Sequence, residues 1–349
     1  MGVRGISKIM ITGGTWSGKT AYLIEKYKYM VEEQGVPSEN ILVLLQNRTQ
    51  ILRWRNECVF SGSGHIWMTT YYGFIQCELK LFYPHLLKKC KDIALKDIEP
   101  VFLTHEAAQY LLTIVIDARR QREGLFEGVK AYSEKISMDL SRNLVTAAVN
   151  NVPYDKIGEL LYSALDKKDS TKKQIYKDMD IVLSSYRQKC LELGVFDYSM
   201  AVEVFNKYLL NDIEYQKSLL KRVKYLIVDN VEEIVPSQAD IVNLLLDKVD
   251  TCLVAYNNDG GCGLSFGGNC ENISNKLSTK LNKVELKGSY CSEQLFHFAD
   301  NLYSSIMQEK DDFKLLKNDS IERNDPVELR SEMLSRIGTR VCSLIERKI

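Results

Sequence analysis

The feature that most constrains this chain is a glycine-rich segment near its N-terminus. Residues 8–12, an apolar run, are predicted to form a buried strand, and residues 21–33 follow a helical period. Between them lies the pattern Gly-x-x-x-x-Gly-Lys-Thr, formed by Gly13, Gly14, Thr15, Trp16, Ser17, Gly18, Lys19 and Thr20. This order of strand, loop and helix is the context in which the pattern forms a phosphate-binding P-loop.

Each residue type in the loop has a physical reason. Glycines let backbone N–H groups turn inward toward a phosphate, and the start of the following helix adds its positive dipole end. We expect Lys19 to reach the β- and γ-phosphates of a nucleotide and the Thr20 hydroxyl to bind Mg²⁺. The alternative is a glycine turn that meets the pattern by chance, and the agreement of strand, loop and helix argues against it.

A P-loop also needs an acidic group for the metal, normally at the end of a buried parallel strand. Residues 224–228 form a largely apolar run that ends at Asp229, and a helical segment with Pro236 near its start follows. Asp229 is therefore the best candidate for holding the metal, through water. The alternative is that Asp229 only caps a helix.

Further β-like runs alternate with helical patterns along the chain. They cover residues 41–45, 66–70, 251–256 and 283–287. Strands that alternate with helices imply right-handed crossovers and a parallel sheet with helices on both faces. Residues 85–194 break this rhythm because they are helical in period throughout, with almost no strand signal. The sequence therefore predicts an α/β fold with an inserted helical subdomain.

Composition excludes several classes of protein. The 46 basic and 46 acidic side chains cancel, so the total charge gives no sign of a nucleic-acid binder, although a local basic groove would not appear in the sum. Nine cysteines without a C-x-x-C pair favour reduced thiols in the cytoplasm over a disulfide framework, with a metal site as the alternative. No export signal is visible, and no apolar stretch approaches the roughly 18 residues that span a membrane.

The order of the motifs resembles the first motor lobe of UvrD/Rep-like superfamily 1 DNA helicases, PcrA among them, and more distantly the AddA/AddB nucleases. Residues 36–44 are similar to the approach to the second strand of that family, and residues 70–74 lie where it has T-F-H-S-F. Residues 196–198 resemble the D-F or D-Y that closes its helical insertion. Residues 227–238 parallel V-D-E-F-Q-D-x-x-P-x-Q, and residues 289–292 fall at N-Y-R-S.

The resemblance implies a RecA-like ATP-binding lobe made of residues 1–84 and 195–287. It also implies an all-helical insertion at 85–194 and the beginning of a second motor lobe at 288–349. The cofactors would be ATP and Mg²⁺. The function would be movement along single-stranded or partly double-stranded DNA in repair or recombination, with a second helicase or nuclease subunit as a further partner.

By position, the resemblance places Thr70, Tyr71 and Tyr72 on the DNA-facing surface, where aromatic rings stack on bases. A tyrosine pair after a strand is also a common way to pack the edge of a sheet, so core packing stays equally open.

The residues that depart from the family pattern stand at positions that the family uses to recognise and hydrolyse the nucleotide. Asn230 stands where the family has the glutamate that activates water, and an amide cannot accept a proton. Gly267 and Cys291 replace two arginines, and the adenine-reading glutamine upstream of the loop is missing. Glu232 or Glu233 could act as the base instead, and the alternative for both is a solvated carboxylate at a helix start.

We expect Lys19, Asp229, Asn230 and Glu232 to form the catalytic set. Only about 60 residues follow Tyr290, so we expect either a piece of a longer helicase or a protein that never closes a full ATP cleft alone. The first hypothesis is an ATP-dependent helicase or translocase. The second is a hydrolysis-impaired subunit that binds nucleotide or DNA as a structural or regulatory module, and a P-loop kinase is a weaker third.

Overall fold

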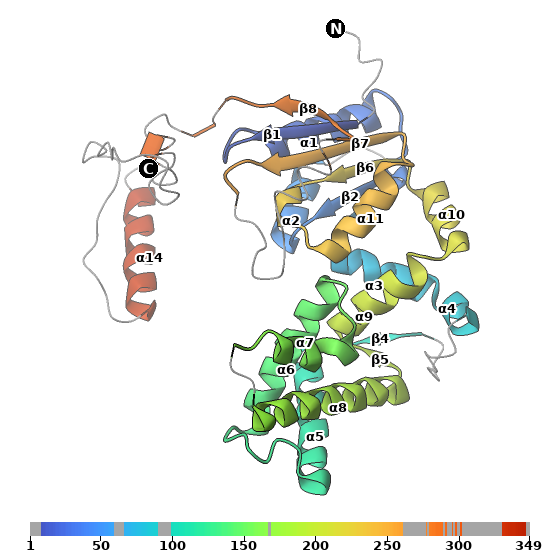
Figure 1. Cartoon of the computed structure of the whole chain (residues 1–349). Coiled ribbons are helices and arrows are strands. Elements are labelled where there is room, and N and C mark those ends of the chain that lie inside the picture. The colour runs from blue at the N-terminus through green and yellow to red at the C-terminus, as the bar shows by residue number, and fades with distance from the viewer. Residues whose placement is uncertain are drawn as a thin grey trace. The chain divides into compact units, whose positions relative to one another are not determined.

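The computed structural model describes two compact units, residues 1–288 and 289–349, and each is treated by itself (Figure 1). The described residues are 8–58, 66–89, 99–166, 169–260, 277, 279–288, 290, 291, 295, 297, 298, 301 and 330–346.

The first unit is built on a six-stranded, fully parallel sheet with the order β3-β2-β6-β7-β1-β8. The strands are β1 (Lys8–Gly13), β2 (Ile41–Leu45), β3 (Met68–Thr70), β6 (Tyr225–Val228), β7 (Thr251–Asn257) and β8 (Asn282–Glu285). The predicted strands are confirmed and differ from the observed ones only at their ends. The α/β fold with a parallel sheet is therefore the fold of this lobe, and it has the RecA-like arrangement.

Neighbouring residues of the central strands alternate between two buried clusters, one on each face of the sheet. Met10 and Val228 belong to one cluster, whereas Ile11 and Ile227 belong to the other. This period of two, with apolar residues at both phases, is typical of strands buried on both faces. Helices α1 (Lys19–Glu32) and α2 (Arg48–Glu57) cover one face, and α11 (Pro236–Leu246) covers the opposite face (Figure 1).

Between β3 and β6 the chain is mainly helical. Its helices are α3 (Tyr71–Leu81), α4 (Tyr83–Lys89), α5 (His105–Glu123), α6 (Ser133–Val149), α7 (Ile157–Ser163), α8 (Ser170–Leu193), α9 (Tyr198–Val204) and α10 (Ile213–Arg222). This stretch also contains the short helix η2 (Tyr154–Lys156) and the π-helix η3 (Phe205–Leu209). Outside it, the short helix η1 (Ser38–Asn40) precedes β2, and η4 (Val231–Glu233) follows β6. The apolar cluster under α11 continues into these helices, so the insertion and one face of the sheet share a core.

The expectation of an all-helical insertion is corrected by a small second sheet. Strand β4 (Val101–Phe102) pairs in parallel with β5 (Val195–Phe196). In the sequence, helices α5 to α8 lie between these two strands. Two residues are too few to show a period, and the pairing depends on segments that are far apart in the chain. The division into domains at residues 85 and 194 stays a prediction.

Side-chain caps mark the starts of five of the helices between β3 and β6. In each case an oxygen accepts a hydrogen bond from a backbone N–H in the first turn. The capping residues are Thr70 for α3, Thr104 for α5, Asp169 for α8, Asp197 for α9 and Asp212 for α10. Gly124 and Gly194 end α5 and α8 in the left-handed conformation that glycine adopts without strain.

The second unit contains α14 (Arg330–Glu346), which exposes Met333, Leu334 and Ile337. Across both units, no helix in the described part of the chain is long and apolar enough to cross a membrane.

Candidate nucleotide-binding site

Three segments of the first unit meet at the carboxyl edge of the sheet. Gly13, the last residue of β1, is the register partner of Asn257, the last residue of β7. Val228 at the end of β6 pairs with Val254, and Asp229 follows it directly. In parallel sheets ligands bind at this edge, where the strands end and the loops begin.

The glycine loop turns tightly at the end of β1. A Cβ added at Gly13 would lie 2.5 Å from Ser17 Oγ and 2.7 Å from the carbonyl oxygen of Leu286, so a larger residue does not fit. Trp16 and Gly18 both have positive φ angles, 62° and 90°. The predicted strand, loop and helix are therefore present, and the loop backbone curls at the start of α1 as phosphate binding requires.

The ammonium group of Lys19 lies inside this loop. It donates hydrogen bonds to the carbonyl oxygens of Gly13 (3.0 Å) and Gly14 (2.5 Å), to Ser17 Oγ (3.3 Å) and to Asn257 Oδ1 (3.1 Å). Burial lowers the pKa of Lys19, against the opposing effect of nearby carboxylates. The positive charge is held at the centre of the loop, close to the carboxylates of the neighbouring strands.

Thr20 and Asp229, the two residues predicted to bind the metal through oxygen atoms, lie in contact. Thr20 Oγ1 donates a hydrogen bond of 2.9 Å to Asp229 Oδ2. Asp229 is only 2% exposed, and burial raises the pKa of its carboxyl group, although hydrogen bonds from Thr20 and from the backbone N–H of Asn230 act in the opposite direction. A hydroxyl and a carboxylate at one place are ligands of the kind that Mg²⁺ prefers, so these residues fit a magnesium ion.

Asn230 directly follows this carboxylate and has a left-handed backbone, with φ 54°. Its amide donates to Glu232 Oε1 (3.2 Å) and accepts from Gln50 Nε2 (3.2 Å), while its backbone oxygen accepts from Gln46 Nε2 (3.1 Å). The amide is therefore fixed in orientation from two sides. It can position a water molecule but cannot take its proton.

Glu232 differs from the solvated carboxylate that we considered as an alternative. It is only 1% exposed, and Glu232 Oε2 accepts a hydrogen bond of 3.0 Å from the backbone N–H of Asn257. Burial raises its pKa to about 7, against the effect of that hydrogen bond. Glu233 is exposed by comparison. Of the two candidate bases, Glu232 is the one that lies among the loops at this edge.

Sequence reasoning missed Asn257, the last residue of β7, and Asp259, which lies two residues beyond it. Asn257 contacts Lys19, Thr15 and Glu232, and Asp259 accepts hydrogen bonds from the backbone and hydroxyl of Thr15. Their position at the end of a predicted parallel strand was the available signal.

The three residues predicted to face DNA lie in different environments. Thr70 Oγ1 caps α3 by accepting a hydrogen bond of 3.1 Å from the backbone N–H of Gly73. Tyr71 is 5% exposed, and its hydroxyl shares its one proton between Asn206 Oδ1 (3.1 Å) and the carbonyl oxygen of Ser237 (3.0 Å). These contacts favour core packing for Tyr71.

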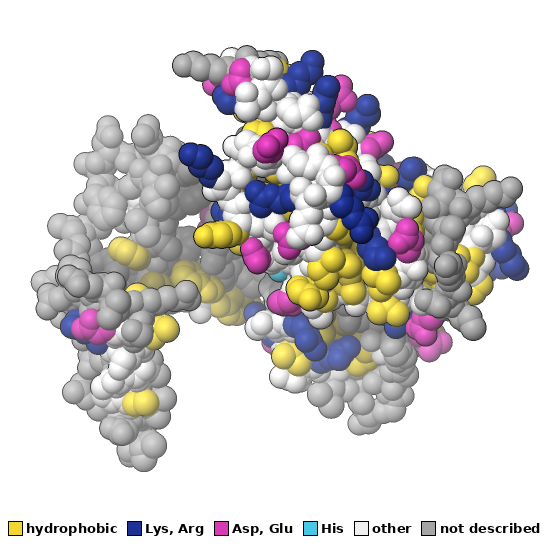
Figure 2. Space-filling model, turned by 90° about the horizontal axis from the view of Figure 1, so that it is seen from below, with side chains coloured by type: hydrophobic (Ala, Val, Ile, Leu, Met, Phe, Trp, Pro, Cys, Tyr) yellow, Lys and Arg dark blue, Asp and Glu magenta, His cyan; other side chains and the backbone are white. Residues whose placement is uncertain are grey.

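Tyr72 is half-buried, and its ring lies 4.6 Å from the ring of Tyr198 at an angle of 36°. A DNA-facing role for Thr70 and Tyr72 stays a prediction. On the face seen in Figure 2, basic and acidic side chains are interspersed, with an apolar patch between them.

Two predicted departures cannot be located at this site. Gly267 lies outside the described residues, and Cys291 belongs to the second unit. The replacement of two arginines therefore remains a statement about the sequence.

A cluster of His85, Asp212 and Glu214 has ligand atoms within 4.8 Å of one another. The ammonium of Lys89 lies among them and donates to Asp212 Oδ2 (2.6 Å) and Glu214 Oε2 (3.3 Å). Because Lys89 already supplies a positive charge to the two carboxylates, we interpret this cluster as a set of ion pairs between α4 and α10.

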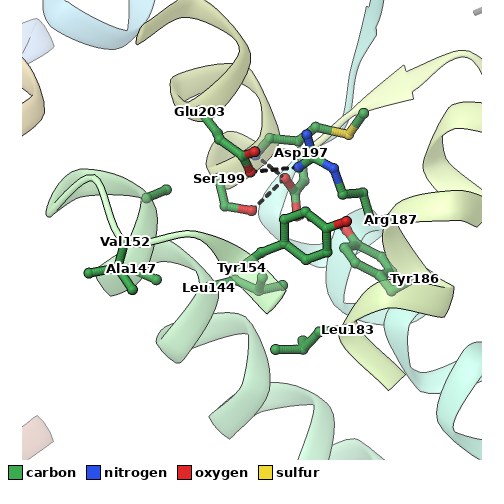
Figure 3. Close-up of a pocket in the computed structure, with 12 residues that line it drawn as sticks. Leu144, Ala147, Val152, Tyr154, Leu183, Tyr186, Arg187, Asp197, Ser199 and Glu203 are labelled. Carbon is green, nitrogen blue, oxygen red and sulfur yellow. Dashed lines mark hydrogen bonds and ion pairs between the residues drawn. The ribbon is translucent and has the colours of Figure 1, made fainter. Parts of the chain in front are cut away.

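A small cavity with a mixed apolar and polar lining lies between α6, α8 and α9 (Figure 3). Tyr186 and Ser199 donate to the two oxygens of the Asp197 carboxylate (2.9 and 2.8 Å), and Arg187 donates to Glu203 (2.7 Å). Its volume of about 10 Å³ leaves room for one water molecule at most. These residues pack the insertion together and leave no space for a substrate.

The parallel sheet, the P-loop and the pairing of Thr20 with Asp229 define the class of this protein as a P-loop NTPase with a RecA-like lobe. The family model of the UvrD/REP helicase N-terminal domain matches residues 5–258. The chain therefore belongs to the UvrD/REP helicase family, as the resemblance of its motifs indicated. No curated protein matches the chain.

Proposed function

We propose that this protein is an ATP-dependent motor that couples hydrolysis to movement along single-stranded DNA in repair or recombination. The observation that carries the proposal is the convergence of Lys19, Thr20 and Asp229 at the carboxyl edge of the sheet, in a chain of the UvrD/REP helicase family.

In this proposal the P-loop backbone and Lys19 hold the phosphates of ATP. Thr20 and Asp229 hold Mg²⁺, the aspartate through water. The metal ion would neutralise charge that develops on the phosphates. The Lys19 ammonium already lies in the loop, where it can exchange its carbonyl partners for phosphate oxygens.

Glu232 is proposed as the general base in place of the glutamate that position 230 lacks. A carboxyl group with a pKa of about 7 is well matched to proton transfer near neutral pH. Asn230, which donates to Glu232 Oε1, would orient the attacking water while Glu232 accepts its proton.

A partner subunit is part of the proposal because two arginines of the family pattern are replaced. An arginine supplied in trans raises the rates of related enzymes by about 10³–10⁵. A second helicase or nuclease subunit is therefore the partner that we propose. Residues 85–194 would act as the inserted subdomain and residues 288–349 as the start of a second lobe.

The test is the rate of ATP hydrolysis by the full chain with Mg²⁺, with and without single-stranded DNA. We expect DNA to stimulate turnover and Lys19→Ala to abolish it. We expect Glu232→Gln to lower it about 100-fold or more, within the usual contribution of a general base. Glu233→Gln is the matched control and should retain most of the rate. Absence of stimulation, with sound binding of ATP and DNA, would reject the motor.

The second candidate is a hydrolysis-impaired subunit that binds nucleotide or DNA as a structural or regulatory module. The replacement at Asn230 favours it, because the amide there cannot act as a base. In that case Lys19→Ala lowers nucleotide affinity, and neither the wild type nor the variant hydrolyses ATP. Turnover that Lys19→Ala abolishes would reject this candidate.

A further inference from the structure

A carboxylate from the loop after β7 lies on the P-loop itself. The backbone N–H of Thr15 donates to Asp259 Oδ1 (2.7 Å) and also approaches Oδ2 (3.0 Å). The hydroxyl of Thr15 donates to Asp259 Oδ1 at 2.9 Å. Asp259 therefore accepts two different donors of a single P-loop residue that is 244 positions away in the chain.

The P-loop binds anions because its backbone N–H groups and its lysine create a positive concavity. A carboxylate satisfies the same requirements as a phosphate: it carries negative charge and accepts N–H hydrogen bonds. Asp259 is also the carboxylate with the largest charge interaction with Lys19. A nucleotide phosphate and Asp259 would thus use the same donors and the same positive potential.

Glycine allows the close approach of the two loops. A Cβ at Gly14 would lie 3.2 Å from Asp259 Oδ2, closer than ordinary van der Waals contact. Asn257, at the start of the same loop, accepts a hydrogen bond from Lys19 and donates one to Thr15. The loop is therefore seated on the P-loop at several points.

Asp259 is nevertheless an exposed residue on a loop, so its carboxylate can turn into solvent. Its carboxylate accepts hydrogen bonds from the backbone N–H and the hydroxyl of Thr15, which are themselves exposed contacts. Release of Asp259 would leave the strand pairing of β7 with β1 unchanged, because that pairing ends at Asn257.

We propose that Asp259 is a displaceable competitor that occupies donors of the P-loop and must leave before nucleotide phosphates bind. This inference rests on the proposed nucleotide-binding function and adds a regulatory step to that site. The turn at residues 258–260 then sets the affinity of the site, and any partner that draws Asp259 away from Thr15 increases nucleotide binding.

The test is an equilibrium titration of the full chain with a fluorescent ATP analogue and Mg²⁺. We would compare the wild type with Asp259→Ala, which removes the competitor, and Asp259→Asn, which keeps the shape and removes the charge. Asp247→Asn is the matched control, because it removes an exposed carboxylate that pairs with Lys280 on the same unit.

We expect Asp259→Ala to bind the analogue about tenfold more tightly, the size expected for one lost charge-assisted contact, with a smaller gain in Asp259→Asn. Asp247→Asn should bind like the wild type. Equal affinities in all four proteins would overturn the competitor while nucleotide binding stands. Weaker binding in Asp259→Ala would identify a ligand-positioning residue instead. Failure of every protein to bind would overturn both the inference and the proposed function.

Discussion

The hydroxyl of Thr20 lies 2.9 Å from a carboxylate oxygen of Asp229, although 209 positions separate the two residues. The hydrogen bond joins the first turn of α1 to the end of β6. It exists because β1 and β6 run in parallel within one sheet, so that the residues following both strands meet at the same edge. The two residues predicted to bind the metal thus lie together, beside Asn230, which stands where the family pattern has a glutamate.

Replacing Asp229 should weaken the metal dependence of nucleotide binding. Asp229→Asn keeps a hydrogen-bond acceptor for Thr20 but removes the negative charge that would orient the water shell of Mg²⁺. We expect the Mg²⁺ concentration that gives half-maximal ATP binding to rise about 10–100-fold, as for other outer-shell ligands. A Mg²⁺ titration at fixed ATP measures it. An unchanged midpoint would remove Asp229 from the metal site, and Asp247→Asn serves as the control.

Glu232 should make the stability of the fold depend on pH. Burial raises its pKa from 4.5 to about 7, so the folded protein holds a proton there that the unfolded chain has lost. Its contribution to stability therefore falls as pH rises from about 4.5 to 7, by a total of about 3 kcal/mol, and is constant above.

Glu232→Gln cannot titrate and should lack this fall. The difference in unfolding free energy between wild type and variant, measured with urea at several pH values, isolates the effect from other buried acids. The same difference at pH 5 and pH 8 would contradict the burial of Glu232.

Removing the hydroxyl of Tyr71 should affect stability and leave DNA binding unchanged. Tyr71→Phe leaves the oxygens of Asn206 and Ser237 without this donor in the core, at a cost of about 1–2 kcal/mol. Urea unfolding and a single-stranded DNA titration measure the two effects. Tyr110→Phe, at a residue that is 70% exposed, is the control. A loss of DNA affinity without a loss of stability would restore Tyr71 to the DNA-facing surface.

The ion pair between the partly buried Arg222 and the buried Glu78 should contribute strongly to the docking of α10 on α3. Arg222 donates to both carboxylate oxygens of Glu78 (2.8 and 2.6 Å), and the side chain of Glu78 is 2% exposed. Arg222→Ala leaves that carboxylate buried without its cation, which should cost about 3–5 kcal/mol. Arg53→Ala breaks an exposed pair with Glu57 and should cost less than about 1 kcal/mol. Equal losses in urea unfolding would refute this difference.

The sheet and the meeting of Thr20 with Asp229 could be predicted from the sequence because their signals are local. The P-loop is a contiguous pattern, and the run that ends at Asp229 is apolar over its buried length. The pairing of β4 with β5 could not be predicted, since each strand has two residues and four helices separate them along the chain.

The rest of the site depends on tertiary contacts. Neighbouring positions 232 and 233 carry the same residue type, and only the fold buries Glu232 and exposes Glu233. The contact of Asp259 with Thr15 likewise follows from the register that places Gly13 beside Asn257. No short-range pattern contains that register.

The most direct test of nucleotide binding at this P-loop is an equilibrium titration of ATP, with and without Mg²⁺, into the wild type and Lys19→Ala. We predict saturable, Mg²⁺-dependent binding to the wild type and an affinity lower by about tenfold or more in Lys19→Ala, because the variant lacks the ammonium held in the loop. Equal affinity of the two proteins for ATP would contradict the assignment of the site.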